Sequence, residues 1–276
     1  STLMNALVGE KLSIITSKAQ TTRHRIMGIV SGEDFQIVYS DTPGILKPSY
    51  KLQESMMKFV TGALTDADVI LYVTDTVEQS ERSAEIVDSI RRSGIPTVVV
   101  INKIDLSTPE ALEALVDKWQ AEIPGAQVVP TSAKENFNIE GLFRTILSLL
   151  PEGPAFYPKD TLTDKTLRFF ASEIIREKIL KFYDKEIPYC CEIEIESYKE
   201  EPTIDRIAAT IYVARDSQKG ILIGHKGEKL KRVGQTARED MEQFLGKKVF
   251  LQLFVKVSDD WRNNERQLRR FGYEQE

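Results

Sequence analysis

Short apolar runs alternate with longer amphipathic stretches along the first 150 residues of the chain. Four Val- and Ile-rich runs, at 34–41, 68–75, 95–102 and 126–132, have the continuous hydrophobicity of strands buried on both faces. Apolar positions recur at helical spacing in the stretches between them, at 80–92, 109–123 and 139–150. This alternation predicts an α/β domain with a largely parallel sheet.

The pattern changes beyond residue 150. Three prolines and a glycine in 149–164 indicate a linker, and a long helical stretch, 164–186, follows. The expected strands after it are 189–200, 204–215 and 248–257. Two short helices are expected around a glycine pair, and a last helix from about Asp259, in the order α-β-β-α-α-β-α. We therefore predict one domain over 1–150, a linker over 151–163 and a second, α+β domain over 164–276.

Composition narrows the class of protein. Of 276 residues, 41% are hydrophobic and 29% charged, which is typical of a globular protein with a sizeable core. No run approaches the ~18 apolar residues of a membrane-spanning helix. Cys190 and Cys191 are adjacent, lack nearby Cys or His partners and are interpreted as strand residues in a reducing compartment. Two histidines in the whole chain argue against a zinc centre.

Charge is distributed unevenly. Residues 1–150 contain 14 basic and 19 acidic side chains, whereas 151–276 contain 23 of each. Within the second part, Lys219 to Arg232 holds five basic residues against one acidic residue, Glu228. Such a local basic patch can bind phosphate groups even in a domain without net charge.

The segment "NKID" closes the Val-rich run at 95–102, at the end of a strand where α/β sheets bind ligands. Asp105 can accept two hydrogen bonds from the N–H groups of a guanine edge, and adenine offers no such pair. A buried carboxylate at this position would therefore reject adenine. Asn102 projects from the same turn, and the stem of Lys103 can lie over the purine. Alone, the tetrapeptide fits a solvated turn better than a binding site.

Two further motifs follow strands in the same domain. In "DTPG", Asp41 can hold Mg²⁺ through water, with Thr42 and Pro43 shaping the turn, and the N–H of Gly44 can approach a terminal phosphate. In "TSAK", the residues Ser132, Ala133 and Lys134 can offer backbone N–H groups to the guanine carbonyl. Each motif is weak alone, and their order at strand ends carries the prediction.

With these motifs in order, the chain resembles the translation-type P-loop GTPases, and more narrowly the ribosome-associated Era family. The resemblance implies a P-loop GTPase domain that binds GTP or GDP with Mg²⁺. It places a first switch in "KAQTTRHRIMGIV" (18–30) and assigns an Mg²⁺-binding hydroxyl to Thr22, with Thr21 as a close rival. A polar loop leading into a strand is the plain alternative for this stretch.

The opening "STLMNALVGE" resembles the helix that follows a phosphate loop G-x-x-x-x-G-K-[ST]. Ser1 then corresponds to the Mg²⁺-binding hydroxyl of that loop, with Thr2 beside the nucleotide. We expect roughly 10–20 further residues, a central strand and the loop, ahead of Ser1 in the biological protein. A chain that truly begins at Ser1 should bind nucleotide poorly.

After "DTPG" stands Ile45, where the best-known small GTPases have a glutamine that orients the attacking water. Resemblance to the Era family implies that this is normal for the group, so hydrolysis should be slow without a partner. No catalytic residue is named. His24 and Arg25 are candidates, although a surface role in the switch suits them better.

In the second domain, Gly224 and Gly227 bracket His225 and Lys226 as G-x-x-G, with apolar residues including Ile223 on both sides. A tight helix–helix turn is the structural alternative. The surrounding element order resembles a type II KH domain, whose loop faces a phosphate backbone. Further phosphate contacts are expected from Lys229, Lys231 and Arg232. Trp261 suits a packed aromatic better than a base-stacking platform.

The resemblance extends over essentially the whole chain and implies a monomeric GTPase switch in small-subunit assembly. Its implied RNA partner is the 3′ end of small-subunit rRNA. We expect a cytoplasmic protein, with weak peripheral association at the inner face of the cell membrane as a secondary expectation. An alternative is an RNA-binding adaptor whose GTPase-like domain is structural. A GTPase acting at the membrane surface is a further rival, which the core-like character of the amphipathic helices disfavours.

Overall fold

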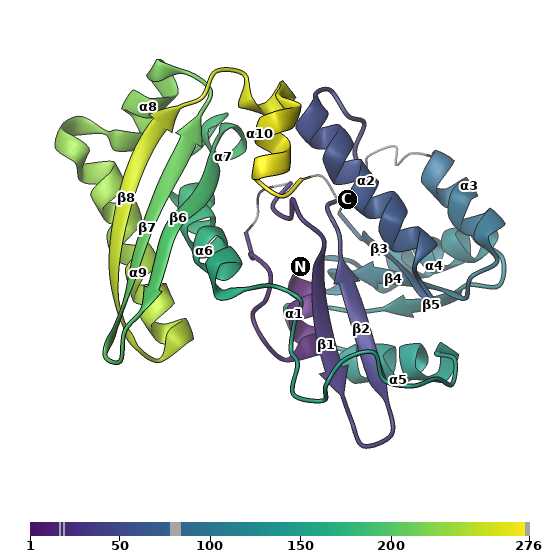
Figure 1. The fold of residues 1–276 in the computed structure, drawn as a ribbon. Helices are drawn as coiled ribbons and strands as arrows, with labels where there is room; N and C mark the ends of the chain where they lie inside the picture. The colour runs from purple at the N-terminus through teal and green to yellow at the C-terminus, as the bar shows by residue number, and fades with distance from the viewer. Residues whose placement is uncertain (17, 19, 78–83, 274–276) are drawn as a thin grey trace. The chain divides into compact units, whose positions relative to one another are not determined.

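The computed structural model describes residues 1–16, 18, 20–77 and 84–273. Their contacts divide the chain into two compact units, each built from separate stretches of sequence (Figure 1). The first unit comprises Ser1–Ser13, Arg25–Lys47 and Met57–Asp164, and the second comprises Ile14–His24, Pro48–Met56 and Lys165–Glu276. The domain boundaries expected from sequence, 1–150, 151–163 and 164–276, stay predictions, because this division by contacts uses discontinuous stretches of the chain.

Two strand ladders form the β structure described in the first unit. The first pairs β1 (Ile26–Ser31) with β2 (Gln36–Asp41) in antiparallel register. The second is parallel, in the order β3-β4-β5, with β3 at Ile70–Asp75, β4 at Thr97–Asn102 and β5 at Gln127–Pro130. These strands confirm the four predicted apolar runs and the α/β class.

The helices within the first unit are α1 (Thr2–Val8), α3 (Ala84–Ser93), α4 (Pro109–Glu122) and α5 (Ile139–Leu149). Helix α2 (Lys51–Thr65) belongs to the second unit up to Met56 and to the first unit from Met57. The predicted helix at 80–92 is observed from Ala84, since 78–83 lie outside the described residues. Helix α2 was not predicted, although its buried Leu52, Met56, Phe59 and Val60 follow a helical period.

The middle strand β4 forms the centre of the first unit. Residues Val98 to Ile101 have no exposed surface, because β3 and β5 flank them and helices pack on the sheet. Side chains of α3 and α4 (Val87, Ile90 and Trp119) share a core cluster with β3 and β4. A strand this deeply buried fixes the position of the turn that follows it.

The proline-rich segment at 151–163 is bound to the first unit. The N–H of Ile29 donates to the carbonyl oxygen of Leu162 over 2.8 Å. The side chain of Gln36 donates to the Tyr157 carbonyl and accepts the N–H groups of Phe156 and Tyr157 at 2.8–2.9 Å. The segment thus extends along the β1-β2 ladder.

The second unit contains one three-stranded sheet in the order β6-β7-β8, formed by Glu192–Glu200, Ile204–Val213 and Lys248–Val257. Strand β7 is antiparallel to β6 and parallel to β8. The helices are α6 (Leu167–Phe182), α7 (Ile187–Cys190), α8 (Asp216–Ile223), α9 (Glu228–Leu245) and α10 (Glu265–Arg270). Buried side chains of α6, α8 and α9 form one core with the sheet. The element order matches the prediction.

Three details of the second unit differ from the predictions. Tyr189 and Cys190 belong to the short helix α7, not to a strand, because Pro188 near its start fixes a helical φ. Helix α9 has 18 residues and is not short. The last helix begins at Glu265, after a 3₁₀ turn that contains Trp261.

The thiols and Trp261 are structural. Burial raises the pKa of Cys190 to about 11 and that of Cys191 to about 12, so both remain protonated and unreactive near neutral pH. Trp261 has no exposed surface, and its Nε1 donates to the Cys190 carbonyl over 2.9 Å. Its predicted packing role is consistent with these contacts.

Within the described ranges, no helix combines the length and the apolar character needed to cross a membrane.

Asn5 of α1 organises the loop that follows this helix. Its Oδ1 accepts the N–H groups of Leu12 and Ser13 at 2.9 and 3.0 Å, and its Nδ2 donates to the Ser13 carbonyl over 2.9 Å. The side chain is buried, so the backbone groups that it satisfies have no ready replacement in water.

We predict that Asn5→Ala lowers the free energy of unfolding of the first unit by about 2–3 kcal/mol, because two buried N–H groups lose their acceptor. Urea unfolding followed by circular dichroism measures this. The control is Asn264→Ala, which removes one exposed cap bond to the Gln267 N–H and should cost about 1 kcal/mol or less. Equal losses in the two variants would contradict the role assigned to Asn5.

Candidate functional site

Hydrogen bonds join the turn after β4 to the loop after β5. Asn102 Oδ1 accepts the N–H of Ala133 at 2.9 Å, and Asp105 Oδ1 accepts the Ser132 hydroxyl at 2.6 Å. Parallel register aligns Ile101 with Pro130, so the two strands end side by side and their loops meet. The structure therefore brings together the "NKID" and "TSAK" residues predicted to contact one ligand.

The exposure of these residues differs from one expectation. Ser132 and Ala133 are buried, which fixes the loop, whereas Asp105 is exposed. The sequence analysis expected a buried carboxylate at Asp105. The protein itself does not bury it, because Asp105 lies in the short exposed 3₁₀ turn Ile104–Leu106. Lys134 is also exposed, and its Nζ lies 2.9 Å from Glu135.

Sequence reasoning missed Asp75 as a neighbour of this turn. The Nζ of Lys103 lies 2.7 Å from the Asp75 carboxylate at the end of β3. The signal was present, since Asp75 ends the apolar run before the one that Asn102 closes, and adjacent parallel strands align their ends.

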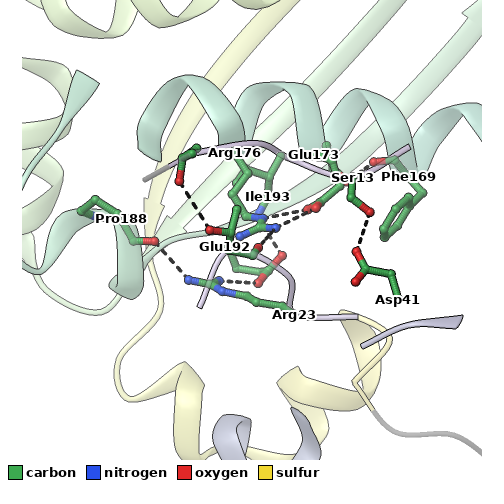
Figure 2. Close-up of polar contacts among 12 residues, drawn as sticks. Ser13, Arg23, Asp41, Phe169, Glu173, Arg176, Pro188, Glu192 and Ile193 are labelled. Carbon is green, nitrogen blue, oxygen red and sulfur yellow. Dashed lines mark hydrogen bonds and ion pairs between the residues drawn. The ribbon is translucent and has the colours of Figure 1, made fainter. Parts of the chain in front are cut away.

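A second cluster lies at the end of β2. The carboxylate of Asp41 accepts the Ser13 hydroxyl at 2.7 Å, and the Ser1 backbone nitrogen lies 3.5 Å from its other oxygen (Figure 2 shows the Ser13–Asp41 bond). The structure thus brings Ser1 and Asp41 together, and it adds Ser13, which the sequence analysis did not single out. Thr2 follows in α1.

The rest of "DTPG" forms an extended loop after Asp41. Thr42 is half-buried, Pro43 is buried and Gly44 is exposed. A Cβ atom at Gly44 would meet no protein atom within 4 Å, so the space beside this exposed glycine is open. Ile45 packs against the core of the first unit.

The donors around Asp41 suit magnesium. Mg²⁺ prefers oxygen ligands and is commonly held by one or two carboxylates together with phosphate and water. Asp41 supplies the carboxylate, and the Ser13 hydroxyl lies 2.7 Å from it. Ser1 approaches the same carboxylate through its backbone nitrogen, and its hydroxyl stays a predicted ligand. Among the described residues, no group of three or more His, Cys, Asp or Glu side chains could hold a metal. A magnesium ion held by one carboxylate, phosphate and water does not require such a group.

The predicted switch residues Thr21 and Thr22 belong to the second unit, in its segment Ile14–His24, so the structure does not group them with Asp41. Arg176 of α6 donates to the Thr21 carbonyl over 2.5 Å. Arg176 is itself held by two bonds, of 2.6 and 2.7 Å, to Glu173 (Figure 2). Thr22 is 8% exposed.

Arg23, which follows Thr22, is almost completely buried in the second unit. Its guanidinium donates to the carbonyls of Cys191 and Pro188, at 2.8 and 3.1 Å, and to the Glu192 carboxylate at 3.1 Å (Figure 2). Tyr273 donates its hydroxyl to the same carboxylate over 2.6 Å. Removing any of these acceptors would leave a buried charge short of partners, although the intact arrangement adds little net free energy after the charges are desolvated.

His24 is packed, not free on the surface as expected. Its ring stacks on Tyr273 with centroids 4.3 Å apart and meets Phe169 edge-on at 5.6 Å. Burial lowers the pKa of His24 to about 4; Glu173 opposes this shift, and Arg176, with other cations, adds to it. Arg25, in the first unit, donates to Ser40 and Asp66 at 2.7 Å.

The G-x-x-G segment forms a tight turn between α8 and α9. Helix α8 ends at Ile223, and Gly224 and Gly227 have φ of 72° and 80°, in the region that favours glycine. Lys226 has a φ of 49°, and both His225 and Lys226 are exposed. The N–H groups of Gly224 and Gly227 donate to the carbonyls of Gly220 and Gly224, at 3.0 and 3.2 Å, and the 18-residue helix α9 begins directly after the turn.

Aromatic rings support the cations beside this turn. The guanidinium of Arg232 lies 4.2 Å from the Phe182 ring centroid, and the Nζ of Lys229 lies 5.8 Å from that of Tyr183. The Tyr183 hydroxyl donates to the carbonyl of Leu222 over 2.6 Å. Lys231 is exposed on the same helix. The two rings were missed from sequence, although they end the long helical stretch.

Family models match both parts of the chain. A model described as "50S ribosome-binding GTPase" matches residues 1–103, and a KH-domain model matches residues 186–262. Among curated proteins, the GTPase Era of Alkaliphilus metalliredigens is 44% identical over 277 residues, covering 99% of this chain and 94% of that protein. The GTPase Era of Staphylococcus haemolyticus is 43% identical over 275 residues, with coverages of 99% and 92%.

Solved structures agree with these relatives. One is Era in complex with MgGDPNP and nucleotides 1506–1542 of 16S ribosomal RNA, with a TM-score of 0.95 and 39% identity, covering 100% of this chain and 94% of that one. Another is Aquifex aeolicus Era Y63A bound to GDP·AlF4⁻, also with a TM-score of 0.95 and 39% identity, with coverages of 100% and 95%.

The lowered pKa of His24 predicts a pH dependence of stability. The unfolded chain takes up a proton near pH 6.5, whereas the folded chain resists it until about pH 4. The contribution of neutral His24 to the free energy of unfolding is therefore fully present above pH 6.5. It falls by about 2–3 kcal/mol as the pH decreases towards 4.

Urea unfolding between pH 7.5 and 4.5 measures this dependence in the wild type and in His24→Phe, which keeps a ring against Tyr273 but cannot titrate. As the pH falls, the free energy of unfolding should decrease more in the wild type than in His24→Phe. The matched control, His225→Phe at the exposed turn, should parallel the wild type. Parallel behaviour of His24→Phe would contradict the assignment.

Proposed function

The chain belongs to the GTPase Era family, and from this membership we propose that it is a GTP-hydrolysing switch that binds small-subunit ribosomal RNA. The nucleotide site would lie in the first unit and the RNA site at the G-x-x-G turn of the second. The observation that carries the nucleotide site is the pair of hydrogen bonds from the Ala133 N–H to Asn102 Oδ1 and from the Ser132 hydroxyl to Asp105 Oδ1.

Guanine recognition falls to the loops after β4 and β5. The exposed carboxylate of Asp105 would accept the N–H groups of the guanine edge, and the Ser132 hydroxyl fixes its rotamer. The Ala133 N–H is already bound by Asn102, and the Ser132 N–H by the Phe137 carbonyl, which leaves the Lys134 N–H for the guanine carbonyl. The stem of Lys103 would cover the purine face.

The residues around Asp41 would hold the magnesium and phosphates. Bound Mg²⁺ neutralises the phosphate charge and orients the terminal phosphoryl group. Asp41 would supply a carboxylate oxygen to its coordination shell and Ser1 would add its hydroxyl, with Thr2 close by, while the bond from Ser13 holds the Asp41 carboxylate in one orientation. The N–H of the exposed Gly44, with Thr42 and the buried Pro43 before it, would face the terminal phosphate.

The switch would depend on Thr22, with Thr21 as its rival. GTP with Mg²⁺ would recruit a threonine hydroxyl, and loss of the γ-phosphate would release it. The side chain of Ile45 packs on the core and cannot orient a water, so intrinsic hydrolysis should be slow.

RNA binding is proposed at the turn between Ile223 and Glu228. There the exposed His225 and Lys226 and the start of α9 suit a phosphate backbone, whereas the N–H groups of Gly224 and Gly227 are bound to the carbonyls of Gly220 and Gly224. Lys229, Lys231 and Arg232 would add phosphate contacts. The relative bound to 16S rRNA nucleotides 1506–1542 supports the 3′ end of small-subunit rRNA as the target and subunit assembly as the role.

This role suggests a cytoplasmic, monomeric protein, which we retain as a proposal. Weak peripheral association with the inner face of the cell membrane is a secondary proposal that vesicle co-sedimentation would test.

For the nucleotide site, we predict that the full-length protein prefers GTP to ATP in calorimetric titration. Asp105→Asn should lower GTP affinity by at least about 100-fold and favour xanthosine triphosphate, because an amide can pair with the second carbonyl of xanthine. Glu135→Gln, next to Lys134, is the control and should retain the preference. A wild type indifferent between GTP and ATP, or unchanged selectivity in Asp105→Asn, would overturn the site.

For the RNA site, we predict that Gly224→Asp lowers affinity for an RNA of the 16S 3′-end sequence by at least about tenfold, with GTP hydrolysis unchanged. The substitution places a negative charge where phosphate must bind. A Cβ at Gly224 would also lie 2.7 Å from the Lys229 side chain.

Gly246→Asp is the matched control for this variant. Gly246 also has a positive φ, of 64°, in the same unit, and a Cβ there meets nothing within 4 Å. It therefore adds the same charge away from the turn, at a smaller backbone cost, because Gly246 has a ψ of 22° and Gly224 a ψ of 179°. Filter binding should show near-normal RNA affinity for Gly246→Asp, and equal losses in both variants would reject the turn as the RNA site.

A further inference from the structure

Asp75 and the lysine of the guanine-recognition turn form an ion pair at the end of the parallel ladder. Strand register places Asp75 directly beside Asn102, and the Lys103 Nζ lies 2.7 Å from Asp75 Oδ2. The Asp75 side chain is 15% exposed and that of Lys103 is 50% exposed. The pair is therefore partly protected from water, with the carboxylate as its more enclosed member.

The Asp75 carboxylate has a fixed orientation. Its Oδ1 accepts the N–H of Val77 at 2.9 Å, so one oxygen is bound to the local backbone while the other faces Lys103. A carboxylate held in this way binds an ammonium group at a defined position.

The next residue, Thr76, holds the main chain of the same lysine. The Thr76 hydroxyl donates to the Lys103 carbonyl over 2.8 Å, and the Thr76 N–H donates to the Asn102 carbonyl over 3.3 Å. Lys103 has a φ of 60°, a left-handed conformation that is unfavourable for a residue with a side chain. The dipeptide Asp75–Thr76 thus fixes both the backbone and the ammonium end of Lys103.

We propose that Asp75 is a positioning residue for guanine-nucleotide binding, which holds the Lys103 stem in place to cover the purine. This rests on the proposed function, in which the Lys103 stem lies over the base. A free lysine side chain loses much rotamer freedom when it is ordered, and a lysine already held by Asp75 loses less on binding.

Asp75 should affect the affinities for GDP and GTP in the same way. Lys103 lies at the base end of the site, so Asp75 strengthens binding of GDP and GTP equally. Discrimination between guanine and xanthine remains with Asp105. A role in sensing the γ-phosphate would instead separate the two nucleotides.

Asp75→Asn is the most informative variant, because the amide oxygen can still accept the Val77 N–H while the charge is lost. In calorimetric titrations of the full-length protein at low salt, the Kd values for GDP and GTP should both rise about three- to fivefold, as for a partly exposed ion pair. The preference for guanine over xanthine should stay unchanged, and the effect should shrink in 1 M salt. Glu140→Gln removes the exposed ion pair with Arg144 on α5 and should leave both Kd values unaltered.

A double-mutant cycle separates positioning from a general structural effect. Lys103→Met keeps an unbranched apolar stem without the ammonium, so Asp75→Asn should change neither Kd further in that background. A loss that persists there, or an unchanged or tighter Kd in the single Asp75→Asn variant, would overturn the proposal. A wild type that binds GDP no better than ADP would overturn the proposed function, and this inference with it.

Discussion

The candidate nucleotide site depends on two hydrogen bonds that tie the turn after β4 to the loop after β5. Asn102 accepts the Ala133 N–H and Asp105 accepts the Ser132 hydroxyl, so each loop determines the shape of the other. Both bonds require the two strands to end at the same level, as the pairing of Ile101 with Pro130 ensures. The buried residues Val98 to Ile101 have no exposed surface, so the apolar core fixes the level at which these polar groups meet.

The segment Ile14–His24 is held within the second unit in a different way. Its bonds are largely polar: Arg176 to the Thr21 carbonyl, and Arg23 to two carbonyls and Glu192. Such bonds replace bonds to water, and a buried ion pair must offset the desolvation of both charges. The net free energy that attaches this segment is therefore smaller than the number of its hydrogen bonds suggests. A stretch expected to exchange partners with a nucleotide needs an attachment of this kind.

The sequence allowed the strands, the strand-end motifs and the element order of the second unit to be predicted, because these follow from local periodicity and from the alignment of parallel strands. It did not predict the contacts of Arg23 with Pro188, Cys191 and Glu192, since no local pattern links positions about 165 residues apart. Asp75 was missed for a related reason. An acidic residue at a strand end is unremarkable until register places it beside Lys103.

Residues 151–276 show how a stretch without net charge can present a basic surface. On the sheet of the second unit, Lys256 pairs with Glu196 at 2.8 Å and Arg270 with Glu194 at 2.6 Å, so these cations are neutralised. At the G-x-x-G turn, Arg232 and Lys229 lie over aromatic rings, and within the described ranges neither forms an ion pair with a carboxylate. A ring orders a cation without cancelling its charge. The positive field at the turn therefore remains available to a phosphate backbone, and the distribution of partners matters more than the number of charges.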